Sequence, residues 1–171
     1  MSNKTAENSL KYALIERERN FLLAPDQDLI KSLPFKTIID NYIERTHIRF
    51  RKVTGNEGSI YKLTKKSPGG SPDKSVITTI YLTEHEYDTL NKFESILVQK
   101  TRFKKVVTGI NIGIDKYVNG NDELWLAEIG EFETDEQMHN YKMPIKYIKE
   151  VTDDPDFNGY NLAKRFGRKN L

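Results

Sequence analysis

The sequence predicts an α+β fold in which antiparallel strands close into a barrel around a polar interior, with helices outside. The first observation is a series of segments that alternate with period two, at about 13–23, 43–53, 59–66, 76–82, 99–107, 109–117 and 124–129. The second is a set of turn sequences between several of them, at 55–58, 67–72 and 119–121. The third is that several of these segments carry charge on one face only.

Two capping boxes predict the helices. Thr83 is followed three residues later by Glu86, and this box opens a helix expected to run to about Leu97. Thr134 and Gln137 have the same spacing and start a shorter helix. Helices of this kind can cover the apolar outer faces of the strands.

Length and composition favour one domain, 1–171, with residues 1–11 as a polar and mobile tail. The chain has no cysteine, which excludes a disulfide framework and a thiolate zinc site. It has no apolar run of membrane-spanning length and no hydrophobic segment typical of a signal peptide, so a soluble cytoplasmic protein is expected. A formal net charge of only +2 excludes a nucleic-acid binder that is basic overall. Any site for a polyanion must be local.

The charged strand faces suggest such a site. Three strands present mainly cations on one face, and these are Arg45, His47, Arg49 and Arg51; Lys62 and Lys66; and Lys100, Arg102 and Lys104. Carboxylates occupy corresponding faces elsewhere, at Glu16 and Glu18, at Asp115 and at Glu128. For any single strand, a row of charged residues can also be an ordinary solvent-exposed face. For Arg45, His47 and Lys104, this interpretation accounts for the charge at least as well as a polyanion site does. Taken together, the faces favour a water-filled interior suited to a multiply charged anion and its metal ions.

Six elements, in order, resemble the CYTH domains, also called triphosphate tunnel metalloenzymes, of the bacterial type. They are E-x-E at Glu16 and Glu18 in IERERNFLL, Tyr42 before R-x-R at Arg49 and Arg51, T-x-K at Thr64 and Lys66, K-x-R at Lys100 and Arg102, Asp115, and LWLAEIGEF near 124–132. VTDDPDFNGYNLA at 151–163 is similar to the closing segment of that family. The resemblance runs from about residue 13 to 164.

The resemblance implies a closed eight-stranded antiparallel barrel whose tunnel holds a triphosphate. It implies phosphate contacts at Arg49, Arg51, Lys66, Lys100 and Arg102, and Lys62 joins them because it shares the face of Lys66. It also implies that Mg²⁺ or Mn²⁺ binds to Glu16, Glu18 and Glu128, with Asp115 as a further ligand or as support for the ligands. Glu131 joins this set if a bulge at Gly130 turns it inward.

The chain departs from the family pattern at three places. Asn20 stands where E-x-E-x-K has its lysine, and an amide cannot carry a charge or transfer a proton at neutral pH. The second carboxylate of the late E-x-E is displaced by one residue, to Glu131. Thr78 and Thr79 stand where relatives often have glutamates. These departures predict weaker cation binding than in the family.

The function implied is metal-dependent hydrolysis of a small-molecule triphosphate, either inorganic tripolyphosphate or a nucleoside or thiamine triphosphate. The sequence indicates no general base and does not select the organic part of the substrate. Adenylate cyclase activity and a noncatalytic polyanion- or nucleotide-binding module are the alternatives. No specific nucleic acid and no membrane is expected as a partner, and both a monomer and a homodimer are compatible with the sequence.

Overall fold

A computed structural model describes residues 11–130 and 132–170. Its strands are β1 (Leu14–Arg17), β2 (Arg19–Leu23), β3 (Phe35–Tyr42), β4 (Ile48–Gly55), β5 (Gly58–Pro68), β6 (Lys74–Leu82), β7 (Ser95–Val107), β8 (Ile110–Asn119), β9 (Asp122–Ile129), β10 (Lys149–Glu150) and β11 (Arg168–Asn170). Its helices are α2 (Gln27–Ile30), α3 (Glu84–Leu90), α4 (Asp135–Asn140), the 3₁₀ turn η1 (Pro155–Phe157) and α5 (Gly159–Phe166). The predicted tail falls almost wholly on residues 1–10, which lie outside the described part.

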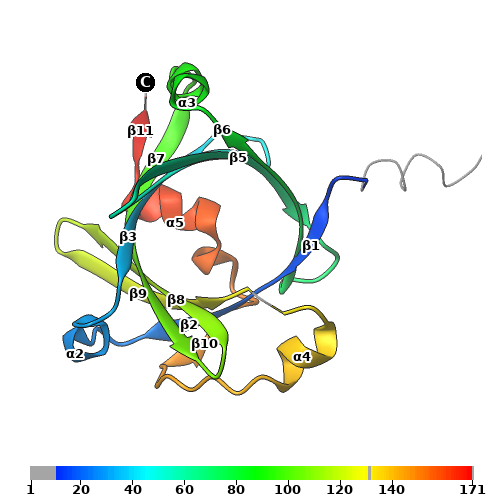
Figure 1. Ribbon diagram of the computed structural model, residues 1–171, viewed down its shortest axis with the longest axis vertical. Helices are drawn as coiled ribbons and strands as arrows, with labels where there is room; N and C mark the ends of the chain where they lie inside the picture. The colour runs from blue at the N-terminus through cyan, green and yellow to red at the C-terminus, as the bar shows by residue number, and fades with distance from the viewer. Residues whose placement is uncertain (1–10, 131, 171) are drawn as a thin grey trace, which may run out of the picture.

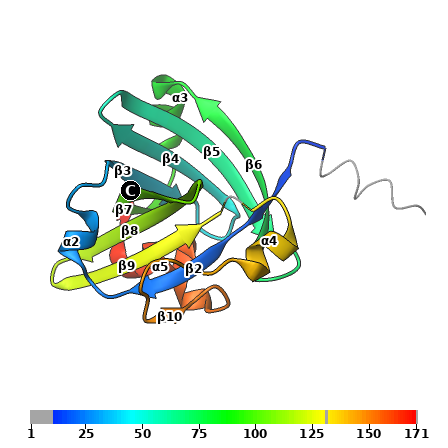
Figure 2. The ribbon, with the colours of Figure 1, turned by 60° about the horizontal axis from the view of Figure 1, so that its bottom comes forward.

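One antiparallel sheet contains all the strands and curls into a ring (Figures 1 and 2). The hydrogen-bonded order is β1-β6-β5-β4-β3-β7-β8-β9-β2-β10, and β11 adds to β7. β1 and β2 stand near opposite ends of this order and do not pair with each other. The α+β class and the antiparallel sheet are therefore confirmed, but the closed eight-stranded barrel is not, because the sheet formed by the described residues has 11 strands and stays open.

The difference arises at Glu18, where the first predicted strand is divided. Before it, β1 pairs with β6, and Glu16 lies opposite Ser75. After it, β2 pairs with β9, and Asn20 lies opposite Glu128. The chain thus passes from one neighbour to the other at Glu18, and no residue of this segment pairs with both. The covalent chain, rather than a ladder of hydrogen bonds, links the two ends of the ring.

β3 was not among the segments predicted from the period-two pattern. Its inner residues Ile38 and Asp40 are 3% and 2% exposed, and Asn41 on the outer face is fully buried. A strand that is buried on both faces has no apolar–polar alternation to reveal it. Asn41 is accommodated on the outer face because its amide donates to the Tyr87 hydroxyl, 3.1 Å away.

Two predicted boundaries were also wrong. The helix after Thr83 ends at Leu90, and Leu97 lies in β7 instead, although the capping box forms as expected. The strand expected from residue 43 begins at Ile48, and the chain before it turns through Arg45, whose φ is +59°. The shorter helix expected after Thr134 is present as α4, with its capping box formed.

Two apolar clusters flank the ring. One packs Phe21, Ile112 and Trp125 beneath the segment that carries α4. The other packs α5 against the wall of the ring, with Leu162 against Leu126 and other strand residues. In Figure 1, α5 is seen across the opening of the ring. Within the described residues, no helix combines the length and the apolar character needed to cross a membrane.

Candidate active site

A polar cavity of about 150 Å³ lies inside the ring. Its wall consists of Glu16, Glu18, Asn20, Tyr42, Arg49, Arg51, Lys66, Lys100, Arg102, Asp115, Tyr117, Leu126, Glu128, Phe157, Gly159 and Leu162. A larger hollow of about 540 Å³ lies beside residues 150–155, but three of its five lining residues are carboxylates, which repel phosphate.

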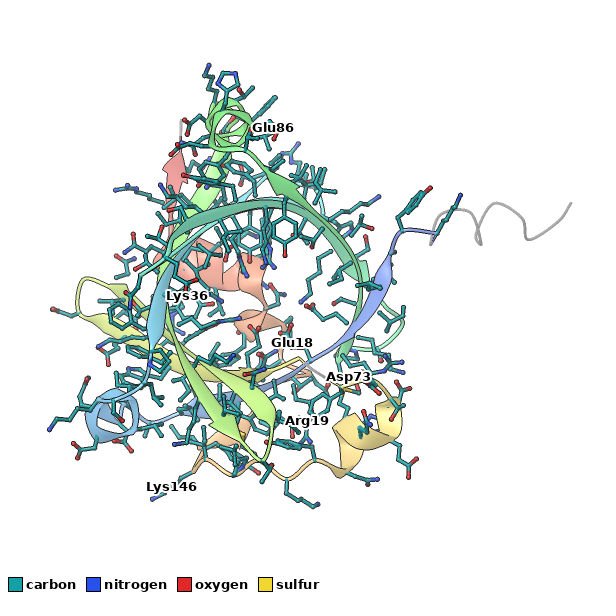
Figure 3. The ribbon with its side chains drawn as sticks, in the orientation of Figure 1. Glu18, Arg19, Lys36, Asp73, Glu86 and Lys146 are labelled. Carbon is teal, nitrogen blue, oxygen red and sulfur yellow. The ribbon has the colours of Figure 1, made fainter. Side chains whose placement is uncertain are left out.

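Nine of the residues predicted from sequence line the cavity, namely Glu16, Glu18, Arg49, Arg51, Lys66, Lys100, Arg102, Asp115 and Glu128. Figure 3 shows Glu18 within the ring of strands and Glu86, on α3, outside it. Lys62 shares the inner face, because it lies opposite Arg51, but it is not part of the cavity wall. Glu131 lies outside the described residues. Arg45 and His47 are exposed in the turn before β4.

Asp115 is the centre of a buried ion cluster. β7 and β8 place it opposite Arg102, whose Nε and Nη2 both donate to it at 2.6 Å. Lys100 Nζ donates to the same carboxylate at 2.6 Å. Burial alone would raise the pKa of Asp115, but these two cations outweigh it and lower that pKa. Both oxygens of Asp115 are thus already engaged in holding cations in place.

Arg102 also reaches the neighbouring strand, where its Nη2 donates to Glu128 Oε2 at 2.6 Å. The guanidinium lies over Gly113, where an added Cβ would come within 3.2 Å of Arg102 Nε. Burial would raise the pKa of Glu128, but Arg102 and Lys100 hold it well below its usual range. A glycine on β8 thus makes room for an arginine that bridges two carboxylates.

Asp40 forms a second ion cluster, and sequence reasoning did not identify it. Arg51 donates to the two oxygens of Asp40 through Nε and Nη2, at 2.5 and 2.8 Å. The signal available for it was its position two residues before Tyr42, which places the two side chains on one face of a strand. Arg51 and Arg49 outweigh the effect of burial and hold the pKa of Asp40 well below its usual range.

Arg49 differs from the other arginines of the cavity because its partners are distant. Its Nε is 3.9 Å from Asp40 Oδ1, and its Nη1 donates to the Tyr42 hydroxyl at 3.4 Å. The Nε atom is buried and has no hydrogen-bond partner among the described residues. Arg49 therefore presents a guanidinium with a buried donor that no hydrogen bond uses.

Lys66 lies between the two carboxylates at the start of the chain. Its Nζ is 2.7 Å from Glu16 Oε2 and 3.0 Å from Glu18 Oε2. Asn20 Nδ2 donates to the other oxygen of Glu18 at 2.8 Å. One ammonium group thus relieves the repulsion between two carboxylates that the sequence places two residues apart.

The interior is balanced in charge. The cations of the cavity wall are Arg49, Arg51, Lys66, Lys100 and Arg102, and its carboxylates are Glu16, Glu18, Asp115 and Glu128. Asp40 is not part of the wall, but it pairs with Arg51 and adds a fifth negative charge. The sequence indicated cations and carboxylates on separate strands, and the register of the sheet brings them together as pairs. Five charges of each sign cancel, so the described cavity does not attract an anion by net charge.

Lysines continue the inner face beyond the cavity. Lys36 lies opposite Arg102, and Lys104 lies opposite Gly113, whose other neighbour is Glu128. Lys62 lies over the ring of Tyr81, with Nζ 5.2 Å from its centroid. None of these three lysines has an ion pair with a described residue. They supply the excess of positive charge that the balanced interior does not.

The segment before and within α5 lies along the cavity wall. Phe157, Gly159 and Leu162 belong to the lining, and a Cβ added to Gly159 would overlap the Tyr42 hydroxyl. Any larger residue at this position would have to displace the Tyr42 hydroxyl, so glycine allows the helix to approach Tyr42 closely. The Tyr42 hydroxyl in turn accepts a hydrogen bond from Arg49, so the position of α5 affects a residue that contacts Arg49.

The residues fit a divalent cation only in part. In the described part of the chain, no group of three or more His, Cys, Asp or Glu side chains is arranged to hold a metal ion. Glu16 and Glu18 do converge on one cation, Lys66 Nζ. Mg²⁺ commonly uses one or two carboxylates together with waters and substrate phosphates, and Glu16 and Glu18 supply the two carboxylates of such a set. Thr79, at one of the positions where glutamate is frequent in the family, bonds instead to Thr64 at 2.9 Å.

The buried carboxylates predict a loss of stability in acid. The pKa values of Asp40, Asp115 and Glu128 are all lowered by folding, so each stabilises the protein above its unfolded-state pKa of about 4. That contribution falls as the pH drops from about 5 through the folded-state values, since the unfolded chain then binds more protons. Urea denaturation at a series of pH values should show this decline, and a free energy of unfolding that stays constant from pH 6 to pH 3 would contradict it.

The chain is similar to known proteins in its structure. No protein-family model and no curated protein matches the sequence. The inorganic triphosphatase NE1496 is 20% identical with a TM-score of 0.53, and the match covers 86% of this chain and 93% of that one. PH1819 from Pyrococcus horikoshii OT3 is 19% identical with a TM-score of 0.55, covering 72% and 82%. The chain shares the fold of these proteins.

A third solved structure agrees with them. The Bacillus halodurans protein bh2851, described as a candidate adenylate cyclase, is 12% identical with a TM-score of 0.56, and the match covers 80% of this chain and 96% of that one. The resemblance to the CYTH domains seen in the sequence is thus confirmed at the level of the fold. These identities are too low to transfer an activity.

Proposed function

We propose that the protein binds a triphosphate in this cavity and hydrolyses its terminal phosphoryl group with the help of a divalent cation. The observation that carries the proposal is Arg49. A guanidinium whose buried Nε has no hydrogen-bond partner, and whose nearest carboxylate is 3.9 Å away, is suited to a ligand with several acceptor oxygens. Phosphate accepts two parallel hydrogen bonds from such a group.

The other cations extend this contact along a chain of phosphates. Arg51 and Arg102 keep their charges close to the cavity while Asp40 and Asp115 hold them in place. Lys66 on β5 and Lys100 on β7 supply further point charges to the same wall. Several cations spread over one cavity suit a linear triphosphate better than a single phosphate group.

The charge balance explains why a cation should accompany the substrate. A triphosphate carries about four or five negative charges, and the cavity wall together with Asp40 offers no net positive charge against them. Glu16, Glu18 and Glu128 are the residues that would hold Mg²⁺ or Mn²⁺, and the bound ion would neutralise phosphate oxygens and lower the pKa of a water. Lys36, Lys62 and Lys104 would draw the anion toward the cavity.

Hydrolysis of a phosphoanhydride needs positioning and charge neutralisation more than covalent chemistry. The paired arginines meet this need, since their carboxylate partners fix their orientation before the substrate arrives. Asn20 stays neutral and is bonded to Glu18 Oε1, so it does not serve as an acid or a base here. Water is the proposed nucleophile, and no side chain is assigned as its base.

The deciding experiment is a panel of triphosphates with the purified protein. Tripolyphosphate, ATP and thiamine triphosphate are incubated with Mg²⁺, with Mn²⁺ or with excess chelator, and orthophosphate, pyrophosphate and cyclic nucleotide are quantified. We expect orthophosphate from at least one triphosphate, only when metal is present, and the same rate from the Lys65→Ala variant, since that exposed lysine faces outward on β5.

The other outcomes separate the alternatives. Pyrophosphate and a cyclic nucleotide from ATP would replace hydrolysis by cyclase activity. Binding without any product would identify a polyanion-binding module. Equal activity in excess chelator would remove the metal from the proposal.

A further inference from the structure

Lys66 occupies the place where the proposed function needs a metal ion. Its ammonium lies 2.7 Å from Glu16 Oε2 and 3.0 Å from Glu18 Oε2. Glu16 lies in β1 and Glu18 follows that strand, whereas Lys66 comes from β5, and β6 lies between β5 and β1 in the sheet. The lysine thus reaches across a strand to neutralise two carboxylates that have no other cation within ion-pair distance among the described residues.

The pairing with Lys66 leaves one carboxylate oxygen without a hydrogen bond. Glu16 Oε2 is buried and has no hydrogen bond of acceptable geometry in the described structure, although Lys66 Nζ is close to it. Glu18 uses its second oxygen to accept from Asn20. A single ammonium facing two carboxylates leaves one negative charge, which a divalent ion in the same position would cancel in full.

Lysine is suited to leave this position. Its charge sits at the end of a flexible four-carbon chain, and about one third of the side chain is exposed. The cavity that it borders also contains Arg49, which lacks close partners. A phosphate bound at Arg49 would present oxygens to a lysine that had been released from the carboxylates.

We infer that Lys66 is a tethered counter-ion that occupies the divalent-cation position between Glu16 and Glu18 in the empty protein. The metal displaces the ammonium, which then turns to a phosphate oxygen of the substrate. This inference rests on the proposed function. No covalent bond changes in the exchange, since one cation replaces another and the ammonium gains a new acceptor.

The exchange has two consequences for binding. Metal alone binds weakly, because its apparent affinity is reduced by the fraction of molecules in which Lys66 holds the site. Binding of either the metal or the triphosphate then raises the affinity for the other. Phosphate stabilises the displaced lysine, and the displaced lysine leaves the carboxylates free to bind the metal. Such coupling is reciprocal between the two ligands.

The test measures Mn²⁺ binding without any phosphate, by calorimetry and by the loss of the free-ion paramagnetic resonance signal. The proteins are the parent, Lys66→Met, Lys66→Arg and the control Lys65→Met, which alters the outward-facing neighbour. We expect Lys66→Met to bind Mn²⁺ about tenfold more tightly than the parent, while Lys66→Arg and Lys65→Met stay close to it. Equal or weaker binding by Lys66→Met would overturn the inference.

A second measurement uses the unaltered protein and does not depend on the folding of the variant. The ¹⁵N resonance of the Lys66 ammonium is followed during titration with Mg²⁺ alone. The exchange predicts that this resonance shifts while that of Lys65 does not. An unchanged Lys66 resonance at saturating Mg²⁺ would show that the metal binds elsewhere. Both readouts are independent of hydrolysis, so a failure of the proposed activity would be recognised separately.

Discussion

Replacing Asp115 with alanine should lower the free energy of unfolding by about 3–5 kcal/mol, the usual cost of removing one partner from a buried ion pair. Asp115 is 2% exposed and holds both Lys100 and Arg102, so its loss leaves two cations in the interior without their principal partner. Glu128 forms a direct ion pair with Arg102 but not with Lys100. The change is measured by urea denaturation at neutral pH.

Asp122→Ala is the matched control. Asp122 also pairs with an arginine, Arg165, but the two side chains are 46% and 51% exposed. Exposed ion pairs contribute about 0–1 kcal/mol, so this variant should remain close to the parent. Similar losses in the two variants would mean that the Asp115 cluster does not stabilise the interior in the way described.

Replacing Arg49 with alanine should weaken tripolyphosphate binding while changing the stability of the empty protein far less than Asp115→Ala does. A hydrogen bond to a charged group contributes about 1.5–3 kcal/mol, which corresponds to roughly a ten- to hundredfold rise in Kd. In the empty protein Arg49 has only distant partners, and Asp40 keeps its close pair with Arg51. Calorimetric titration with tripolyphosphate and thermal melting measure the two effects.

Two comparisons make the Arg49 result specific. Arg168→Ala removes an exposed arginine on β11 and should leave tripolyphosphate affinity unchanged. Arg51→Ala should destabilise the empty protein, because it leaves Asp40 buried with only the distant Arg49. If Arg49→Ala lowered the melting temperature as much as Arg51→Ala and kept full affinity, Arg49 would be structural.

The inner faces of the strands could be predicted from sequence because a strand presents every second residue to one side. Glu16 and Glu18, Arg49 and Arg51, and Lys100 and Arg102 all have this spacing, and all line the cavity. The pairing between these residues could not be predicted, because it depends on the register of one strand against another. Arg102 meets Asp115 only because β7 and β8 align them. The sequence therefore indicated the composition of the cavity but not its charge balance.

There are also physical reasons why other features of the site were not predicted from the sequence. Asp40 lies on β3, whose two buried faces hide the period-two pattern. The incomplete pairing of Arg49 depends on distances in three dimensions, and Arg49 and Arg51 are indistinguishable in the R-x-R motif itself. The division of the first strand at Glu18 follows from its two different neighbours, β6 and β9, which no local signal specifies.

The most direct test of the central claim is the ¹H–¹⁵N resonance of Arg49 Nε during titration with tripolyphosphate in the presence of Mg²⁺. This buried donor lacks a hydrogen-bond partner in the described structure, and a phosphate in the cavity would provide one. We therefore expect the Arg49 Nε resonance to shift and its proton to exchange more slowly with water, while the exposed Arg168 stays unchanged. Saturable binding of tripolyphosphate that leaves the Arg49 resonance in place would contradict the assignment of this cavity as the triphosphate site.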